Sequence, residues 1–460
     1  MNRRIIFLPF AAFFITAVSA ETYRIAGVQY VIEGKTTKPA LERTLKIDTS
    51  RTFGSRDSFE AYVQTLREQL SSCRTFDSTD IQETVSSDTT ASPQNGTGDI
   101  SMTLTVTVHD TKNLIIVPYP SYSSNTGFSV KLKLKDYNFA GTLSPLSASV
   151  YYAPDDDTFD LVPDKRIGGD ITLVTPFTIF RKDAYLTTSA DAAYVINRNS
   201  VVCNGSLQFE YEPVTFGAFR WGPYALLSGG RNNAYTEGGY EADAALGQKL
   251  SASQIIWNGN FRRGYAVSLI QTCSYDFIQS QPYIVCSAEA GQFYPFARTG
   301  AVPRAGFTSR EFFLYKSGSE LLRNGGMYLR GIRDRDIRTD LFLSCNIDFP
   351  FTLFTITVPE TSKLSLFNCE VQCSPFIDMA LYHNSAPETY FNPKDGSYSF
   401  GMDVNVFPAR WRSLQVHGSF GFDAVKLLEK CSSDTAARLF NMSWRTGPLF
   451  EISAGIGLFY

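Results

Sequence analysis

The sequence predicts an all-β transmembrane barrel of about sixteen antiparallel strands, preceded by one small α+β domain. Three observations support this prediction. After residue 112, apolar and polar residues alternate in many short segments. Helical spacing is concentrated between residues 23 and 110. The last segment, "LFEISAGIGLFY", has apolar residues at alternate positions and closes on an aromatic residue, Tyr460.

Residues 1–20 have the features of a secretory signal peptide. Arg3 and Arg4 precede the apolar run "IIFLPFAAFFITAV", and the small residues at 18–20 fit a cleavage site. The run is shorter than the ~20 residues that a membrane-spanning helix needs. We therefore expect the mature chain to begin near Glu21 and to leave the cytoplasm.

The composition argues against several classes of function. A net charge of −3 is unfavourable for a nucleic-acid partner, because phosphate binding needs a basic surface. The chain has three histidines and neither a G-x-S-x-G nor a P-loop pattern, so we expect no enzyme and no cofactor. Cys369 and Cys373 lack a nearby Cys/His pair, so we expect no metal site there.

Residues 21–112 are predicted to form the α+β domain. "YRIAGVQYVIEG" reads as a strand, and "KPALERTLKI" and "RDSFEAYVQTLREQLSSC" have helical spacing. Asp57 is expected to cap the second helix, with Glu60 three residues later. "RTFDSTDIQETV" and "ISMTLTVTVH" follow as strands.

Residues 113–460 are predicted to form the barrel. In "VKLKLKDY", for example, Val130, Leu132 and Leu134 share one face and three lysines share the other. Alternating segments of about 10 residues, separated by turn residues, are typical of transmembrane β-barrels. The 348 residues give ~22 for each of sixteen strands with its connection, which suits strands of ~9–11 residues.

A secreted β-sandwich or propeller would also alternate, but the last segment favours the barrel. Its apolar face is continuous and ends on an aromatic residue, which resembles the C-terminal signal of bacterial outer-membrane barrels. The residues on this face are Phe450, Ile452, Ala454, Ile456, Leu458 and Tyr460.

The order of elements in residues 21–112 resembles a POTRA domain, with Gly34 at the end of the first strand and "CRTFDSTDI" before a later one. One POTRA-like unit followed by a barrel resembles the BamA/TamA/FhaC superfamily of outer-membrane assembly and secretion proteins. The family's lumen loop motif is matched by "YLRGI", which contains Leu329, Arg330, Gly331 and Ile332. Ile332 stands where the family usually has an aromatic residue.

The resemblance implies that the loop folds back into the barrel and that Arg330 binds an aspartate on a later strand. Asp378 in "PFIDMALY" matches that aspartate, although Ala380 stands where the family has glycine. A charge facing lipid costs ~2–4 kcal/mol at mid-depth, so we expect both residues in the lumen. Arginine can hold a carboxylate with two parallel hydrogen bonds, which lysine cannot. Residues 333–338 either bind charges of the lumen wall or form a solvated loop.

The resemblance further implies an assembly or insertion factor in the bacterial outer membrane, with the POTRA domain in the periplasm. A lateral seam is expected between the first barrel strand, at residues 127–137, and the last. The expected partners are the lipid bilayer, unfolded outer-membrane or secreted polypeptides, and accessory lipoproteins. The expected seam residues are Gly127, Val130, Leu132, Leu134, Ile452, Ile456, Leu458 and Tyr460.

Two alternative functions remain open. One is a two-partner-type secretion pore, whose relatives usually have two POTRA units and an N-terminal plug helix; the strand beginning at Tyr23 leaves no room for such a plug after Glu21. The other is a passive porin or receptor, for which a POTRA domain has no purpose.

One disulfide is expected in the barrel. "SLIQTCSYDFIQSQPYIVCSAE" reads as a hairpin that turns at residues 279–281, which would set Cys273 almost opposite Cys286. Cα atoms of directly opposed residues lie ~4.5–5.5 Å apart, close enough for a disulfide.

Overall fold

The structure is a computed structural model of the chain. No helix among the described residues is long and apolar enough to cross a membrane. The structure describes residues 22–73, 75–86, 99–111, 113–124, 127–154, 164–180, 182–233, 239–299, 302–318, 322, 324–333, 336–359, 361–385, 388–409, 414–442 and 447–458.

The N-terminal part is a four-stranded sheet with two helices on one face. The strand order is β2-β1-β4-β3, and the central pair, β1 and β4, is parallel. The predicted order of strands and helices is confirmed, and the short β2 is added to it. The elements are β1 (Thr22–Glu33), α1 (Lys38–Leu45), β2 (Thr52–Phe53), α2 (Arg56–Ser72), β3 (Phe76–Val85) and β4 (Asp99–Asp110).

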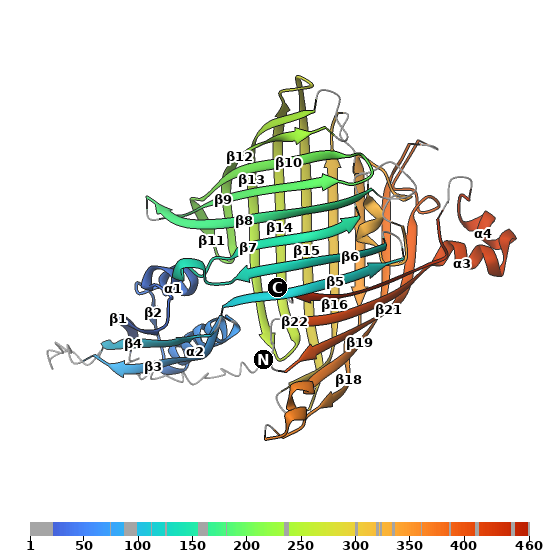
Figure 1. The fold of residues 1–460 in the computed structure, drawn as a ribbon. Coiled ribbons are helices and arrows are strands. Elements are labelled where there is room, and N and C mark those ends of the chain that lie inside the picture. Colours follow the sequence, from blue (N-terminus) through green and yellow to red (C-terminus); the bar gives the residue numbers. More distant parts are fainter. Residues whose placement is uncertain are drawn as a thin grey trace, which may run out of the picture.

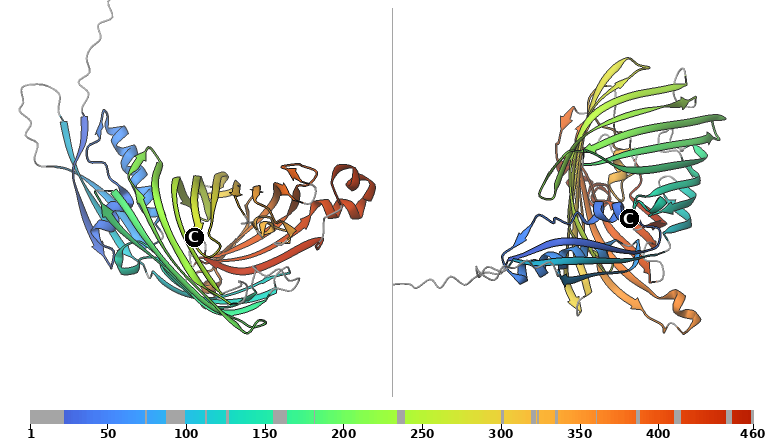
Figure 2. Two further views of the ribbon diagram at one scale, coloured as in Figure 1. Left: turned by 90° about the horizontal axis from the view of Figure 1, so that it is seen from above. Right: turned by 90° about the vertical axis from the view of Figure 1, so that its left-hand side faces the viewer.

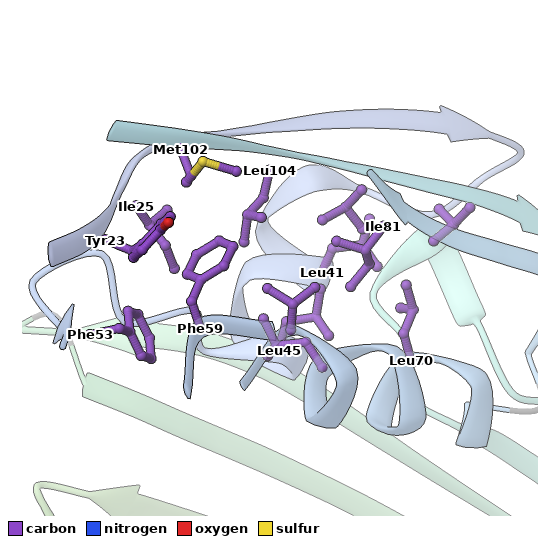
Figure 3. Close-up of a cluster of buried hydrophobic side chains, with 14 of the residues drawn as sticks. Tyr23, Ile25, Leu41, Leu45, Phe53, Phe59, Leu70, Ile81, Met102 and Leu104 are labelled. Atoms are coloured by element: carbon purple, nitrogen blue, oxygen red, sulfur yellow. The ribbon is translucent and has the colours of Figure 1, made fainter. Parts of the chain in front are cut away.

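Helix α2 begins at its cap and buries one apolar stripe. Ser55, rather than Asp57, is the N-cap, and its hydroxyl accepts a hydrogen bond from Ser58 N at 3.2 Å. Asp57 lies in the first turn, where its charge suits the helix dipole. The buried stripe packs against the sheet and forms the core of the domain (Figure 3). Its residues are Phe59, Val63, Leu66 and Leu70.

The rest of the chain forms a closed antiparallel barrel of sixteen strands, as predicted. Pro213 separates β10 from β11 within one strand, and Phe349 and Pro350 separate β17 from β18 within another, because proline cannot donate to the ladder. The strands are β5 (Leu114–Ser123), β6 (Gly127–Asp136), β7 (Leu146–Pro154), β8 (Lys165–Ile179), β9 (Lys182–Val195), β10 (Ser200–Glu212), β11 (Val214–Phe216), β12 (Phe219–Asn232), β13 (Tyr240–Asn258), β14 (Phe261–Asp276), β15 (Gln281–Thr299), β16 (Val302–Lys316), β17 (Leu341–Asp348), β18 (Phe351–Ile356), β19 (Cys369–Asn384), β21 (Ser397–Pro408), β22 (Leu414–Asp423) and β23 (Phe450–Leu458).

The short elements lie in the connections. Strand β20 (Thr389–Tyr390) pairs with the end of β19. The short 3-10 helices are η1 (Phe139–Gly141), η2 (Gly325–Tyr328) and η4 (Lys363–Phe367). Helices α3 (Ala424–Cys431) and α4 (Ser433–Leu439) connect β22 to β23.

The barrel has two distinct ends. The α+β domain lies at one end, and α3 and α4 project from the other (Figures 1 and 2). We call these the domain end and the helix end. The two parts are joined by hydrogen bonds such as Thr37 N to Gly141 O, at 2.9 Å.

The first barrel strand is not the predicted one. Residues 127–137 were expected to open the barrel, but β5 precedes them and β6 is therefore the second strand. Strand β5 contains Pro118 and Pro120, which weaken its strand signal in the sequence. Closure of the barrel occurs between β5 and β23.

The predicted disulfide is wrong. The hairpin of β14 and β15 turns at residues 277–280, so Cys273 is opposite Ile284 and Cys286 is opposite Gln271. The two cysteines are therefore diagonal neighbours, and both are free thiols. Diagonal neighbours lie ~7–8 Å apart, too far for a disulfide.

Candidate functional site

The connection between β16 and β17, residues 317–340, starts at the helix end, and its described residues 324–333 and 336–340 fold back into the barrel. We call it the lumen loop. Its apolar residues Leu329, Ile332 and Ile337 are buried and pack against Phe342 and Tyr382 of the barrel wall. The loop is therefore held inside the barrel by an apolar cluster as well as by its charges.

Arg330 lies at the centre of the lumen loop contacts. Its Nε donates to Asp378 Oδ2 at 2.9 Å and its Nη2 to Asp378 Oδ1 at 2.6 Å, which is the two-bond geometry expected of arginine and a carboxylate. The backbone N–H of Arg330 also donates to Asp378 Oδ2, at 2.9 Å. The structure thus brings together the two residues that the sequence motif pairs.

Two further carboxylates, from neighbouring strands, bind the same guanidinium. Nη1 of Arg330 donates to Asp348 Oδ1 at 2.5 Å and to Asp403 Oδ2 at 2.6 Å. The guanidinium carbon lies 3.7 Å from the centre of the Phe376 ring, a cation–π contact. Asp378 is completely buried, so its charge depends on Arg330 for compensation.

Asp348, Asp403 and Phe376 were not predicted as site residues. The alternation of Asp348 and Asp403 with apolar neighbours indicates an inward face, but it does not indicate which inward residues meet. Asp378 on β19 and Asp403 on β21 both reach Arg330 because those strands are adjacent in the barrel. That adjacency is a property of the closed sheet.

Gly331 allows the loop backbone to touch the barrel wall. Its φ is +87°, in the region that favours glycine, and a Cβ there would lie 2.6 Å from the carbonyl carbon of Gly421 on β22. A Cβ on Gly421 would in turn lie 2.8 Å from Gly331 N. Two facing glycines therefore make this contact between loop and strand possible.

The lumen loop also reaches the seam between β23 and β5. Gly331 N donates to Glu451 Oε2 of β23 at 3.3 Å, and Ser123 Oγ of β5 donates to Glu451 Oε1 at 2.8 Å. Glu451 is thus bonded to the loop on one side and to the first barrel strand on the other.

The other charges of the loop are only partly described. Asp334 and Arg335 lie outside the described residues. Asp336 lies 3.9 Å from Lys426 of α3, and burial raises the pKa of Asp336 to about 6 while Lys426 opposes this. Asp336 of the lumen loop therefore packs against α3.

The seam itself is a short ladder. Among the described residues, β23 and β5 pair only from Ser453 with Ser123 to Gly455 with Ser121. By contrast, β5 pairs with β6 along its full length, and β22 pairs with β23 from Phe422 with Phe450 to Leu414 with Leu458. In the part of the two strands that the structure describes, three residue pairs close the barrel at this point.

The seam prediction needs correction on one side. Gly127, Val130, Leu132 and Leu134 lie on β6, one strand away from the seam, because β5 was not recognised as a strand. On the other side, three of the four predicted residues lie on the seam strand β23, and Tyr460 lies outside the described residues. Those on β23 are Ile452, Ile456 and Leu458.

Two cavities lie beside Arg330 in the lumen. One, of about 400 Å³, is lined by polar residues such as Asp403, His417 and Ser419. The other, of about 730 Å³, is lined by residues that include Tyr328 and Asn346. Both cavities therefore border the lumen loop at Arg330.

The comparisons with known proteins show the fold. No family model and no curated protein matches the sequence. Among solved structures, CdiB from Acinetobacter baumannii matches with a TM-score of 0.59 and 11% identity, covering 95% of this chain and 74% of that one. CdiB from Escherichia coli matches with a TM-score of 0.52 and 9% identity, covering 96% and 92%.

BamA from Haemophilus ducreyi lacking POTRA domains 1–3 also matches, with a TM-score of 0.49 and 11% identity over 93% of this chain and 84% of that one. At such identities a likeness shows the fold alone. The two CdiB structures confirm at that level the resemblance on which the sequence analysis relied.

Proposed function

We propose that this chain is an outer-membrane protein that inserts or assembles polypeptides in the bilayer through the seam between β5 and β23. The observation that carries the proposal is the three-pair ladder that closes the barrel. A strand edge with unpaired backbone groups binds another strand by main-chain hydrogen bonds. Opening this seam breaks fewer bonds than opening either neighbouring ladder.

The lumen loop supports the same proposal, because it contacts the last strand from inside. Arg330 fixes the loop to β17, β19 and β21, and Gly331 carries it to Glu451 of β23. Glu451 also accepts the hydrogen bond from Ser123 across the seam. Movement of the loop would therefore alter the contacts that hold the seam closed.

In this proposal the α+β domain lies in the periplasm and receives unfolded polypeptide at the open edge of its sheet. Strand β3 is at one edge of that sheet, and within the described residues its one partner strand is β4. Accessory lipoproteins are further candidate partners. The proposal includes no catalytic step and no cofactor.

A second candidate is a secretion pore that passes an unfolded polypeptide through the lumen. The two cavities beside Arg330 favour it, because they leave open space of about 400 and about 730 Å³ next to the lumen loop. Passage would require the lumen loop to leave its position, whereas lateral insertion requires the seam to open. The two mechanisms therefore differ in which contact must break.

A disulfide across the seam separates these candidates. Ser123 and Ser453 are directly opposed, and such a pair outside the hydrogen-bonded positions has Cα atoms ~4.5 Å apart, which suits a disulfide. In a chain whose native cysteines are replaced by serine, Ser123→Cys with Ser453→Cys should lock the seam. Insertion of an urea-unfolded eight-stranded outer-membrane barrel into liposomes should then fall at least tenfold and recover with reductant.

The matched control keeps Ser453→Cys and combines it with Ser419→Cys, because Ser419 is opposite Ser453 on β22. This disulfide leaves the seam free and should leave insertion unchanged. Full insertion activity with the oxidised seam disulfide would refute the lateral mechanism. Release of polypeptide into the liposome interior from that locked protein would favour the pore.

A further inference from the structure

The ladder between β23 and β5 ends next to Pro120 and Pro118 of β5. If the register continued beyond Gly455 and Ser121, Ile456 would be opposite Pro120 and Leu458 would be opposite Pro118. Neither pair occurs within the described residues 114–124 and 447–458, although β23 continues to Leu458 and β5 continues down to Leu114. Among the described residues, the ladder of paired residues therefore stops at Gly455 and Ser121.

The backbone bonds show which residues face the seam. In an antiparallel pair, the N–H and C=O groups of one residue point to the same side, and those of the next residue point to the other. Ser124 N donates across the seam to Ile452 O at 2.9 Å. Even-numbered residues of both strands therefore direct their backbone groups into the seam.

Two bonds on the outer sides agree with this assignment. Asp423 N donates to Leu449 O at 2.9 Å, which places odd-numbered residues of β23 towards β22. Tyr137 N donates to Asn113 O at 3.1 Å, which places odd-numbered residues of β5 towards β6. Both ladders keep a continuous register, so the alternation holds along each strand.

Pro118 and Pro120 are therefore both on the seam side of β5. Proline has no backbone N–H, so neither can donate to β23. The residues that face β6 all have an N–H, which accounts for the complete ladder on that side. These residues are Ile115, Val117, Tyr119, Ser121 and Ser123.

We propose that Pro118 and Pro120 are positioning residues that keep the domain-end half of the seam unpaired. The use of this unpaired half rests on the proposed function, but the claim that the two prolines keep it unpaired does not. At positions 118 and 120, β5 offers only acceptors, whereas the opposite residues Ile456 and Leu458 of β23 offer both donors and acceptors. The seam therefore cannot close completely, and the edge that can form a full ladder belongs to β23.

Hydrogen exchange of single backbone amides tests this claim in the full-length protein. The amides of Ile456 and Leu458 face the seam and should exchange faster than that of Gly457, which faces β22. Pro118→Val with Pro120→Val restores both donors, and the Ile456 and Leu458 amides should then gain at least tenfold protection. Both proline side chains are exposed on the outer face, so valine there does not disturb a packed interior.

Single substitutions sharpen the test. Pro120→Val alone should protect Ile456, its opposite residue, and leave Leu458 in fast exchange. Pro176→Val is the control, because Pro176 lies on β8 opposite Tyr185, away from the seam, and should change neither amide. Heat-modifiable migration of each variant shows that its barrel has formed.

The same variants are assayed for insertion of the unfolded barrel into liposomes. Added protection together with lost insertion supports both proposals. Added protection with normal insertion supports the role of the prolines and refutes the lateral mechanism. No added protection in a folded double variant overturns the role of the prolines, whatever the insertion activity.

Discussion

At the scale of single residues, one arginine joins three strands of the barrel wall. Arg330 binds carboxylates on β17, β19 and β21, and its side chain is 20% exposed while Asp378 is fully buried. Three carboxylates around one guanidinium leave excess negative charge, and Arg310 offsets part of it through Asp348 at 3.2 Å. Loss of Arg330 would leave these carboxylates confined together without their shared partner.

A double-mutant cycle tests the interaction of Arg330 with Asp378. Removing one partner of a buried pair costs about 3–5 kcal/mol in a dry interior, and lumen water lowers that cost. Arg330→Ala and Asp378→Ala should each leave a folded, heat-modifiable barrel with a loop that proteases cleave faster and with impaired insertion. The double variant should be little worse than Arg330→Ala alone. Fully additive losses would show that the two residues do not interact.

At the scale of elements, the lumen loop and β22 meet through their backbones. The facing glycines Gly331 and Gly421 permit this contact, and Gly401 on β21 lies just behind it, since its Cβ would be 2.8 Å from the Cα of Gly421. The small residues thus form a strip on the inner wall against which the loop rests. The loop position therefore depends on shape as well as on charge.

Gly331→Ala should displace the loop while Arg330 is still present. Alanine at a positive φ costs about 1–2 kcal/mol, and the close contact with Gly421 adds to this. Electron paramagnetic resonance of a spin label in the loop should show increased motion. Gly418→Ala is the control. Gly418 lies on β22, as Gly421 does, and its Cβ would lie 3.9 Å from the nearest atom, Ser453 O. Equal mobility in the two variants would argue against the glycine contact.

At the scale of the whole molecule, the α+β domain is bound to the connection between β6 and β7. Asp110 accepts from Lys35 N at 2.6 Å, Thr36 N at 2.9 Å and Asn138 Nδ2 at 3.2 Å, so one carboxylate joins both parts. Gly141 approaches so closely that a Cβ would lie 1.9 Å from Lys35 O. These contacts fix the angle between the domain and the barrel (Figure 2).

Asp110→Ala should loosen this junction. Lys35 N, Thr36 N and Asn138 Nδ2 lose their shared acceptor, and each lost bond to a charged group contributes about 1.5–3 kcal/mol. Distances between a spin label on α2 and one on β13 should spread over a wider range. Asp80→Ala is the control, since the Asp80 carboxylate accepts from Gln82 within the domain. An unchanged distance distribution in Asp110→Ala would show that other contacts hold the angle.

The sequence by itself determined what depends on local pattern. Alternation of apolar and polar residues is a property of each strand, so it predicted the barrel and the inward face of Asp378. The resemblance of "YLRGI" to the family's loop motif implied that Arg330 and Gly331 lie in a lumen loop.

Only the tertiary structure decided what depends on neighbours. The identity of the first strand, the absence of the disulfide between Cys273 and Cys286, and the approach of Asp348 and Asp403 to Arg330 all follow from register and closure. A shift of two residues in a hairpin keeps every side chain on its face but changes its partner, so alternation cannot detect it. Pro118 and Pro120 obscured β5 in the sequence, because proline has no backbone N–H and is rare inside strands. The same missing N–H suits these residues to a strand edge that is left unpaired.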